Sequence, residues 1–299
     1  MKLEQIGFYT LSDDRAVNAS PTSPLWRCEL ILTDKCNFMC PYCRGLRSDV
    51  SGEMDFSFAM SIVREWCDQG LRNVRFSGGE PMLYSGLASL VHYCKSRGVE
   101  RIAISTNGSA SKEMYTEMID AGVTDFSVSL DACCSAVADR MSGYSGAWDT
   151  VVENIKWLAE RQYTTVGIVV NRENIATCLG TILLADSLGV SDIRVISAAQ
   201  YDQLLTNLAE LPDKVLKKYP ILDYRVSNIR SGRHVRGLRP GDSDRCWLAL
   251  DDMAVAGRYH FPCIICGSKE TRSERSGRAQ EGKENYGLKT IIAGLIQSV

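Results

Sequence analysis

The sequence Cys36-Asn37-Phe38-Met39-Cys40-Pro41-Tyr42-Cys43 places three cysteines in one short stretch, with the spacing C-x3-C-x2-C. Three thiolates this close on one loop can hold three irons of a cubane iron–sulfur cluster. No fourth cysteine follows at ligand spacing, so one iron would lack a protein ligand and could bind another molecule. We therefore expect Cys36, Cys40 and Cys43 to be metal ligands.

The length, composition and net charge of the chain limit the classes of protein to which it can belong. With 299 residues, 45% of them hydrophobic and 23% charged, the chain can form one large α/β domain, or a main domain with a small addition. A net charge of −2 gives no overall attraction to nucleic acid or to an acidic membrane. Twelve cysteines, a polar start and no apolar run of eighteen residues favour a cytoplasmic protein with no membrane partner.

Strand-like and helix-like segments alternate six times, and glycines close several of the helices. This pattern predicts an α/β fold whose parallel strands are joined by right-handed crossovers. In such folds the functional groups gather at the C-terminal ends of the strands. We expect strands at 25–33, 72–76, 101–105, 125–130, 164–170 and 192–196, and helices at 56–69, 84–97, 112–121, 148–161 and 175–188.

Polar residues follow each of these strands. The second strand runs into Ser77-Gly78-Gly79-Glu80-Pro81, a turn in which glycines allow a close approach of the backbone. Any one of these positions can be an ordinary turn or a polar cap. Several of them at one edge, beside three cysteines, predict a binding site. The others are Ser105, Asn107, Ser129, Asp131, Asn171 and Ser197.

Taken in order, these motifs resemble those of the radical S-adenosylmethionine (radical SAM) superfamily over roughly residues 25–200. The resemblance implies a partial (β/α)6 TIM-type barrel and a [4Fe–4S] cluster whose open iron is chelated by S-adenosylmethionine. Tyr42 corresponds to the aromatic residue before the last cysteine, and Gly78-Gly79-Glu80 to the motif that receives the amino group of S-adenosylmethionine. It further implies cofactor-binding roles for the strand-end residues named above.

The same resemblance implies the chemistry. Reductive cleavage of S-adenosylmethionine gives a 5′-deoxyadenosyl radical, which removes a hydrogen atom from the substrate. A flavodoxin- or ferredoxin-type reductant is implied as a partner. Cys133 and Cys134 follow Asp131 and are candidate hydrogen-atom donors to a substrate radical. The alternative is that they are ordinary thiols at the start of a helix.

A second cysteine group comprises Cys246, Cys263 and Cys266, with the spacing C-x16-C-x2-C around an expected hairpin at 253–262. It resembles the twitch or SPASM-type region that holds an auxiliary [4Fe–4S] cluster in several radical SAM enzymes. Zinc with His260 as a fourth ligand is the alternative. A fourth cluster ligand could also come from Cys28 or Cys178.

The expected organisation has four parts. These are a lead-in at 1–24, the radical SAM barrel at 25–200, an arginine-rich and auxiliary-cluster region at 201–267, and a mobile tail with a short C-terminal helix at 268–299. Within the third part we expect a helix at 201–218.

Six arginines lie within residues 225–245, and Arg233 and Arg236 are the ones we expect to contact an anionic substrate. This favours modification or isomerisation of a nucleotide or nucleic-acid base, for example a phage-type modified thymine in DNA. The alternative for the arginine-rich stretch is an ordinary solvated loop. A peptide-modifying enzyme, an epimerase or cross-linking enzyme, is the second hypothesis. Only 24 residues precede the first expected strand, which is short for a peptide-recognition module.

A noncatalytic iron–sulfur electron carrier or zinc protein is a hypothesis of another class. Such a protein would bind its metal through a full set of protein ligands. It would have no use for an open iron or for the Gly-Gly-Glu-Pro turn at 78–81.

Overall fold

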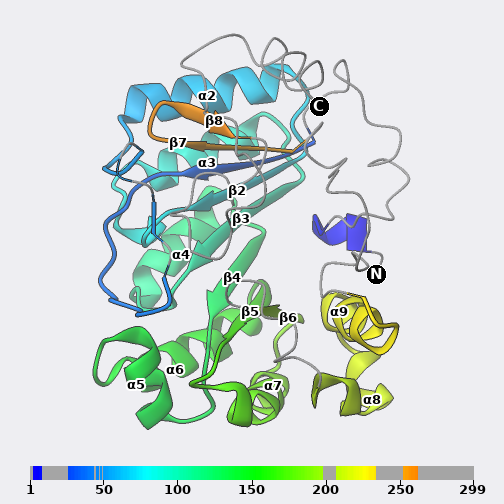
Figure 1. The fold of residues 1–299 in the computed structure, drawn as a ribbon. Helices are drawn as coiled ribbons and strands as arrows, with labels where there is room; N and C mark the ends of the chain where they lie inside the picture. Colours follow the sequence, from blue (N-terminus) through cyan, green and yellow to red (C-terminus); the bar gives the residue numbers. More distant parts are fainter. Residues whose placement is uncertain are drawn as a thin grey trace. The chain divides into compact units, whose positions relative to one another are not determined.

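The structure is a computed structural model that describes residues 3–8, 26–43, 45–46, 48, 50–197, 207–233 and 252–261 (Figure 1). The chain divides into two compact units, each of which we treat by itself. The β1 unit comprises residues 9–36, 44–102 and 245–299, and the β4 unit comprises residues 1–8, 37–43 and 103–244. One of the places where the chain passes from one unit to the other lies within strand β3 (Arg101–Thr106).

The β1 unit is built on strands in the order β2-β1-β7-β8. Strand β1 pairs in parallel with both β2 and β7, while β7 and β8 form an antiparallel hairpin. Helices α2 and α3 contact each other, and Leu30, Trp66 and Phe76 are completely buried in this unit. Its elements are β1 (Arg27–Ile31), α2 (Phe56–Asp68), β2 (Asn73–Ser77), the 3-10 helix η2 (Pro81–Leu83), α3 (Leu87–Ser96), β7 (Asp252–Ala256) and β8 (Tyr259–Phe261).

The β4 unit is built on parallel strands in the order β3-β4-β5-β6, and helices α5 and α6 contact each other beside them (Figure 1). Helices α6 and α7 contact β5, and α9 contacts β6. Its remaining elements are η1 (Leu3–Ile6), α4 (Lys112–Ala121), β4 (Asp125–Ser129), α5 (Ser135–Ser142), α6 (Ala147–Ala159), β5 (Tyr163–Val170), η3 (Ile175–Thr177), α7 (Cys178–Ser187), β6 (Asp192–Ser197), α8 (Asp213–Leu216) and α9 (Pro220–Arg230).

Local sequence signals explain where several helices begin and end. Asp55 caps α2, because its carboxylate accepts a hydrogen bond from the Phe58 amide at 2.9 Å. Ser111 caps α4 in the same way, and α4 ends at Gly122, whose φ of 117° lies in the left-handed region. The expected α/β pattern of six strands is confirmed, and the parallel pairings fit the expected partial barrel.

The structure also corrects some expected boundaries. Helix α5 was not among the helices expected from apolar spacing, because it is short and only half of its residues are apolar, although the alternative interpretation of Cys133 and Cys134 placed the start of a helix there. The helix expected at 201–218 is wrong for its described part, where α8 begins only at Asp213, after Pro212. A proline cannot continue a helix because it lacks an N–H and clashes with the preceding turn. Helix α9 lies partly in the arginine-rich stretch and starts at Pro220, a favoured first position.

The expected hairpin at 253–262 is confirmed over its described residues, with Gly257 at the turn and a φ of 57°. Its pairing partner was not expected. Strand β7 lies parallel to β1, with Met253 opposite Cys28. The hairpin closes a small apolar cluster of Ile31, Val50, Ala254, Ala256 and Phe261. The hairpin is thus a continuation of the β1 sheet.

None of the helices within the described ranges is both long enough and apolar enough to cross a membrane.

Asp192 joins β6 to the start of α9. Its side chain is fully buried, and its carboxylate oxygens accept hydrogen bonds from the Ile221 amide at 3.0 and 3.2 Å and from the Ile193 amide at 2.7 Å. Burial raises the pKa of the Asp192 carboxyl to about 6, against the effect of these hydrogen bonds. A carboxyl whose pKa is higher in the folded than in the unfolded chain favours folding most when it is protonated.

We predict that Asp192→Asn is destabilising and that its cost depends on pH. Since the folded pKa lies above the unfolded value of about 4, the stability that Asp192 contributes falls as pH rises from about 4 to about 6. The loss of unfolding free energy in the variant should be larger at pH 4.5 than at pH 7, by about 1–2 kcal/mol. Denaturant unfolding at both pH values measures it.

Asp186→Asn is the matched control. The hydrogen bond from Lys218 and then that from Tyr219 lower the pKa of Asp186, so its contribution is present above the unfolded pKa and is lost as pH falls. The cost of this variant should be nearly the same at pH 7 and at pH 4.5, because both values lie above the unfolded pKa of about 4. The same pH trend in both variants would contradict the assignment.

Candidate active site

The cysteine loop follows β1 and has no regular secondary structure. Cys36 and Cys43 are exposed, Cys40 is half-buried, and none of the nine cysteines in the described ranges forms a disulfide. The described side chains do not gather three or more Cys, His, Asp or Glu around one metal position. Three accessible thiols on one irregular loop are nevertheless the donor set that an iron–sulfur cluster takes, so the residues fit this group.

Within the β4 unit, Asn37 attaches the start of the loop segment 37–43 to the turn after β3. The Asn37 side chain donates to the Ser109 hydroxyl at 2.8 Å and accepts from the Asn107 amide at 2.7 Å. Ser109 in turn donates to Asn107 through its hydroxyl at 2.6 Å. The expected site residue Asn107 therefore contacts the cysteine loop directly and shapes the turn beside it.

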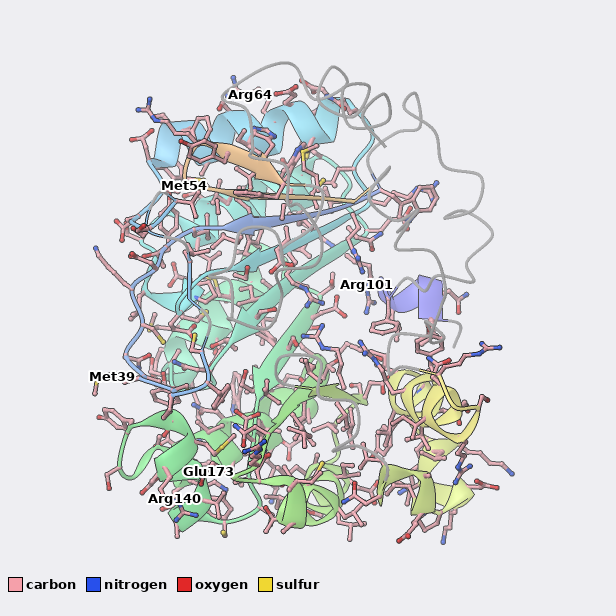
Figure 2. All side chains as sticks on the ribbon, in the orientation of Figure 1. Met39, Met54, Arg64, Arg101, Arg140 and Glu173 are labelled. Atoms are coloured by element: carbon pink, nitrogen blue, oxygen red, sulfur yellow. The ribbon has the colours of Figure 1, made fainter. Side chains whose placement is uncertain are left out.

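Phe38 and Met39 attach the middle of the loop to the end of α5. The Met39 amide donates to the Ser142 carbonyl at 2.8 Å, and the Phe38 ring stacks on Tyr144 with centroids 5.6 Å apart. Gly143 is required here, because it has a φ of 64° and a Cβ atom would lie 2.6 Å from the Met39 carbonyl oxygen. Met39 itself is 78% exposed on the outside of the loop (Figure 2).

Tyr42 attaches the last turn of the loop to the end of β4. The Tyr42 hydroxyl donates a short hydrogen bond to Asp131 Oδ2. The turn itself is closed by the Cys43 amide, which donates to the Cys40 carbonyl at 3.0 Å. Tyr42 lies between these two cysteines in the sequence, so the hydrogen bond acts on the part of the loop that carries them.

Asp131 is held from two further sides. Its Oδ1 accepts from the Val169 amide of β5 at 2.6 Å. The Asn174 side chain donates to the Asp131 carbonyl at 2.7 Å and to the Val169 carbonyl at 2.9 Å. Both carboxylate oxygens of Asp131 thus have partners within the chain, which is a different use from the cofactor contact expected for this residue.

Burial raises the pKa of Asp131 to about 6, although the hydrogen bonds from Tyr42 and Val169 act in the opposite direction. Burial also raises the pKa of Tyr42, with the Asp131 charge adding to the effect. The tyrosine therefore keeps its proton at neutral pH and remains the donor. Burial raises the pKa of the nearby Cys178 thiol to about 12, so this thiol stays protonated.

In the β1 unit, the Gly78-Gly79-Glu80 turn packs against the backbone just before Cys36. The Gly79 amide donates to the Thr33 carbonyl at 2.6 Å, and the Glu80 amide donates to the Lys35 carbonyl at 2.8 Å. A Cβ atom on Gly78 would lie 2.5 Å from the Thr33 oxygen, and one on Gly79 would lie 2.2 Å from the Lys35 oxygen. Only glycine permits so close an approach of two backbones.

Glu80 is buried, with 1% of its surface exposed. Its Oε1 accepts from the Met82 amide at 3.0 Å and so caps the short helix η2. The turn and the segment 33–35 thereby form one tightly hydrogen-bonded unit that leads into the first cysteine.

The other expected strand-end residues lie where the sequence placed them, at the ends of strands in the β4 unit. Ser105 is half-buried in β3, and Ser129 is exposed at the end of β4. Asn171 follows β5, where its Oδ1 accepts from the Glu173 amide at 2.8 Å. Ser197 ends β6, and its side chain is outside the described atoms.

The two candidate hydrogen-atom donors have different surroundings. The half-buried Cys133 thiol points toward the Thr177 carbonyl at 3.9 Å. Cys134 is exposed and takes the N-cap position of α5, which is the place expected for a thiol at the start of a helix.

The second cysteine group, Cys246, Cys263 and Cys266, lies outside the described residues. Two of its suggested additional ligands, Cys28 and Cys178, are buried in β1 and at the start of α7. His260 is also buried, its Nδ1 lies 3.3 Å from the Met253 sulfur, and burial lowers its pKa.

Of the two arginines expected to contact substrate, Arg233 is half-buried just beyond α9, and Arg236 lies outside the described residues. Two other arginines of the same stretch make contacts within the β4 unit. The Arg225 guanidinium lies over the Phe8 ring at 5.5 Å, and Arg230 pairs with Asp213 at 2.8 Å.

Sequence reasoning missed three asparagines that shape the site. Asn37 bonds the cysteine loop to the turn after β3, and Asn174 bonds Asp131. Asn154 of α6 donates to the Gly108 carbonyl at 2.9 Å and to the Ala110 carbonyl at 2.8 Å. Asn154 and Asn174 are buried. The only local signal was that Asn174 follows Asn171 by three residues, a spacing suited to a side-chain turn.

We predict that Gly79→Ala destabilises the β1 unit, because its methyl group would overlap the Lys35 carbonyl. The free energy of unfolding should fall by at least about 2 kcal/mol. Gly167→Ala is the control, because a Cβ atom there meets only the Val128 oxygen at 3.8 Å. Thermal unfolding of both variants measures the difference, and equal melting temperatures would contradict the close approach.

Comparisons with known proteins place the chain among relatives of two kinds. It is 29% identical over 185 residues to a PqqA peptide cyclase of Bradyrhizobium diazoefficiens, covering 61% of this chain and 49% of that protein. It is 30% identical over 179 residues to a probable GTP 3',8-cyclase of Saccharolobus solfataricus, covering 58% and 57% respectively. The chain thus spans about half the length of the curated relatives it matches.

Among solved structures, the fold is similar to that of SuiB of Streptococcus suis bound to its precursor peptide SuiA, with a TM-score of 0.66 and 14% identity. The match covers 94% of this chain and 68% of SuiB. The sequence pattern of the radical SAM superfamily matches residues 30–185, from β1 into α7. This chain belongs to the radical SAM superfamily, whose members imply a [4Fe–4S] cluster and S-adenosylmethionine.

Proposed function

We propose that this protein is an enzyme that cleaves S-adenosylmethionine reductively and removes a hydrogen atom from its substrate. The observation that carries the proposal is the attachment of the cysteine loop within the β4 unit, to the ends of β3 and β4 through Asn37 and Tyr42 and to the end of α5 through Met39. A noncatalytic electron carrier would not require this arrangement or the Gly-Gly-Glu turn. When bound, the cluster would supply the electron that breaks the carbon–sulfur bond of S-adenosylmethionine.

The chain's own residues would bind and orient the reactants. Cys36, Cys40 and Cys43 would hold the cluster. We assign the amino group of S-adenosylmethionine to the Gly78-Gly79-Glu80 turn, whose backbone is held rigidly against residues 33–35. Rigid binding groups of this kind keep a reacting carbon close to the hydrogen that it takes, which is the main protein contribution to such a step.

We assign ribose and carboxylate contacts to Ser105, Ser129, Asn171 and Ser197, which end strands of the β4 unit. Asn107 and Asp131 we place behind this layer, because their side chains already bind the cysteine loop. A flavodoxin- or ferredoxin-type protein is the reductant that we propose. A second [4Fe–4S] cluster at Cys246, Cys263 and Cys266 completes the cofactor set.

We consider two substrate classes, a nucleotide and a peptide, and a specific observation supports each. The 30% identical GTP 3',8-cyclase relative supports a nucleotide, as do Arg233 and Arg236. The 29% identical PqqA peptide cyclase relative supports a peptide. The use of Arg225 and Arg230 in internal contacts reduces the number of arginines that a nucleotide could contact. Isomerisation of a DNA base is the narrower form of the nucleotide hypothesis.

We predict that Cys40→Ala abolishes formation of 5′-deoxyadenosine. The protein is reconstituted without oxygen, mixed with S-adenosylmethionine and dithionite, and the product is measured by chromatography. Cys67→Ala, which removes a half-buried thiol of α2, is the matched control and should retain the product. A normal yield from Cys40→Ala would show that the cysteine loop is not the cluster site.

A second prediction separates the substrate classes. If the substrate is a nucleotide or DNA, the double variant Arg233→Ala, Arg236→Ala should bind GTP or duplex DNA at least about tenfold more weakly, because each hydrogen bond to a charged group contributes roughly 1.5–3 kcal/mol. Arg161→Ala, at an exposed arginine beyond α6, is the control. Unchanged affinity in the double variant, together with binding of a ribosomal peptide, would remove the nucleotide hypothesis.

A further inference from the structure

We propose that Asp131 is a positioning residue that acts through Tyr42 to fix the Cys40–Cys43 turn in the shape that cluster binding requires. The inference rests on the proposed function, in which these cysteines hold the cluster. It assigns the buried carboxylate to the protein's own loop, as an anchor for the metal ligands.

Asp131 is a fixed anchor whether or not Tyr42 is present. Its Oδ1 is bound by the Val169 amide at 2.6 Å, and its carbonyl is bound by Asn174 at 2.7 Å. The residue just before it, Leu130, donates its amide to the Gly167 carbonyl at 3.0 Å. Asp131 is therefore fastened to β5 through backbone and side chain, and its Oδ2 presents a fixed acceptor.

Tyr42 transmits this position to the cysteines. It lies two residues after Cys40 and one before Cys43, inside the turn that the Cys43 amide closes on the Cys40 carbonyl at 3.0 Å. The loop's first half is attached separately, through Asn37 and Met39. Asp131 thus supplies the second half of the loop with its own attachment to the sheet.

Metal ligands need such support because a site works only when its ligands are held within about 0.5 Å of the required geometry. Residues that orient a metal ligand without touching the metal typically change metal affinity about 10- to 100-fold when they are mutated. The hydrogen bond also lies in a partly buried place and goes to the buried Asp131 carboxylate, where it is stronger than a bond in water. A side chain that only filled space would not need the hydroxyl.

The first test uses the chain without its cluster. Tyr42→Phe removes only the hydroxyl, and hydrogen exchange read by mass spectrometry should show the peptide containing the Cys43 amide exchanging about tenfold faster. Tyr219→Phe is the matched control. It removes another tyrosine–aspartate hydrogen bond of the β4 unit, from Tyr219 to Asp186 at 2.5 Å, and should leave the exchange of residues 37–43 unchanged.

The second test uses reconstituted protein. Tyr42→Phe should lose iron to a chelator about tenfold faster than the wild type, and Tyr219→Phe should not. Electron paramagnetic resonance of the reduced cluster should also change in Tyr42→Phe alone. Equal chelation rates and unchanged spectra in Tyr42→Phe would overturn the proposal, even if the variant unfolds at a lower temperature.

A double-mutant cycle separates a joint effect from two independent ones. In the double variant Tyr42→Phe, Asp131→Asn, exchange at Cys43 should be no faster than in the faster of the two single variants, because both changes break the same link. Additive effects would overturn the proposal. Should the Asp131 variants not fold, the comparison of Tyr42→Phe with Tyr219→Phe still decides.

The outcome is distinguishable from failure of the proposed function. Exchange in the cluster-free chain reports the link between Asp131 and the loop, whereas 5′-deoxyadenosine formation reports the chemistry. Faster exchange in Tyr42→Phe together with a normal 5′-deoxyadenosine yield from Cys40→Ala would refute the cluster assignment, and with it the positioning role. If the Cys43 amide of Tyr42→Phe exchanges as slowly as that of the wild type, and Cys40→Ala forms no 5′-deoxyadenosine, the positioning role alone is refuted.

Discussion

The hydrogen bond from Tyr42 to Asp131 ties an irregular loop to a regular sheet, and the rest of the candidate site in the β4 unit is arranged around it. A loop of eight residues with three cysteines has no regular hydrogen bonding of its own, so its shape must come from outside. The β4 unit supplies that shape at three points: Asn37 bonds the turn after β3, Met39 bonds the end of α5, and Tyr42 bonds Asp131 after β4. Asp131 is buried, and its carboxylate also accepts a hydrogen bond from the Val169 amide of β5. The strands therefore set its position.

In the β1 unit, backbone contacts fix the segment that leads into the cysteine loop. Two glycines let the turn at 78–80 lie directly against residues 33–35, where any side chain on Gly79 would overlap the Lys35 carbonyl. Buried Glu80 then caps the following short helix. The first cysteine therefore follows a segment fixed by backbone contacts, while the segment that carries the later two is fixed by the Asn37 and Tyr42 side chains and by the Met39 amide. A rigid scaffold with irregular functional loops is a common way to hold reactive groups.

Much of the fold could be predicted because its signals are local. The apolar runs that became β3 and β5 and the capped helix α4 are readable from neighbouring residues alone. The parallel pairing of β7 with β1 joins residues more than two hundred positions apart, and no local pattern encodes it. The same holds for the site. The cysteines and glycines stood out by spacing, whereas Asn37 and Asn174 matter through partners that only the folded chain brings near.

The arginine-rich stretch shows why counting charges overstates a binding site. Arg225 and Arg230 belong to α9, where one packs on the Phe8 ring and the other bonds Asp213 and the Leu211 and Ala209 carbonyls. A guanidinium with five donors is well suited to such internal work, since it can satisfy several carbonyl groups at once. Six arginines in the sequence therefore do not make six ligands for a phosphate.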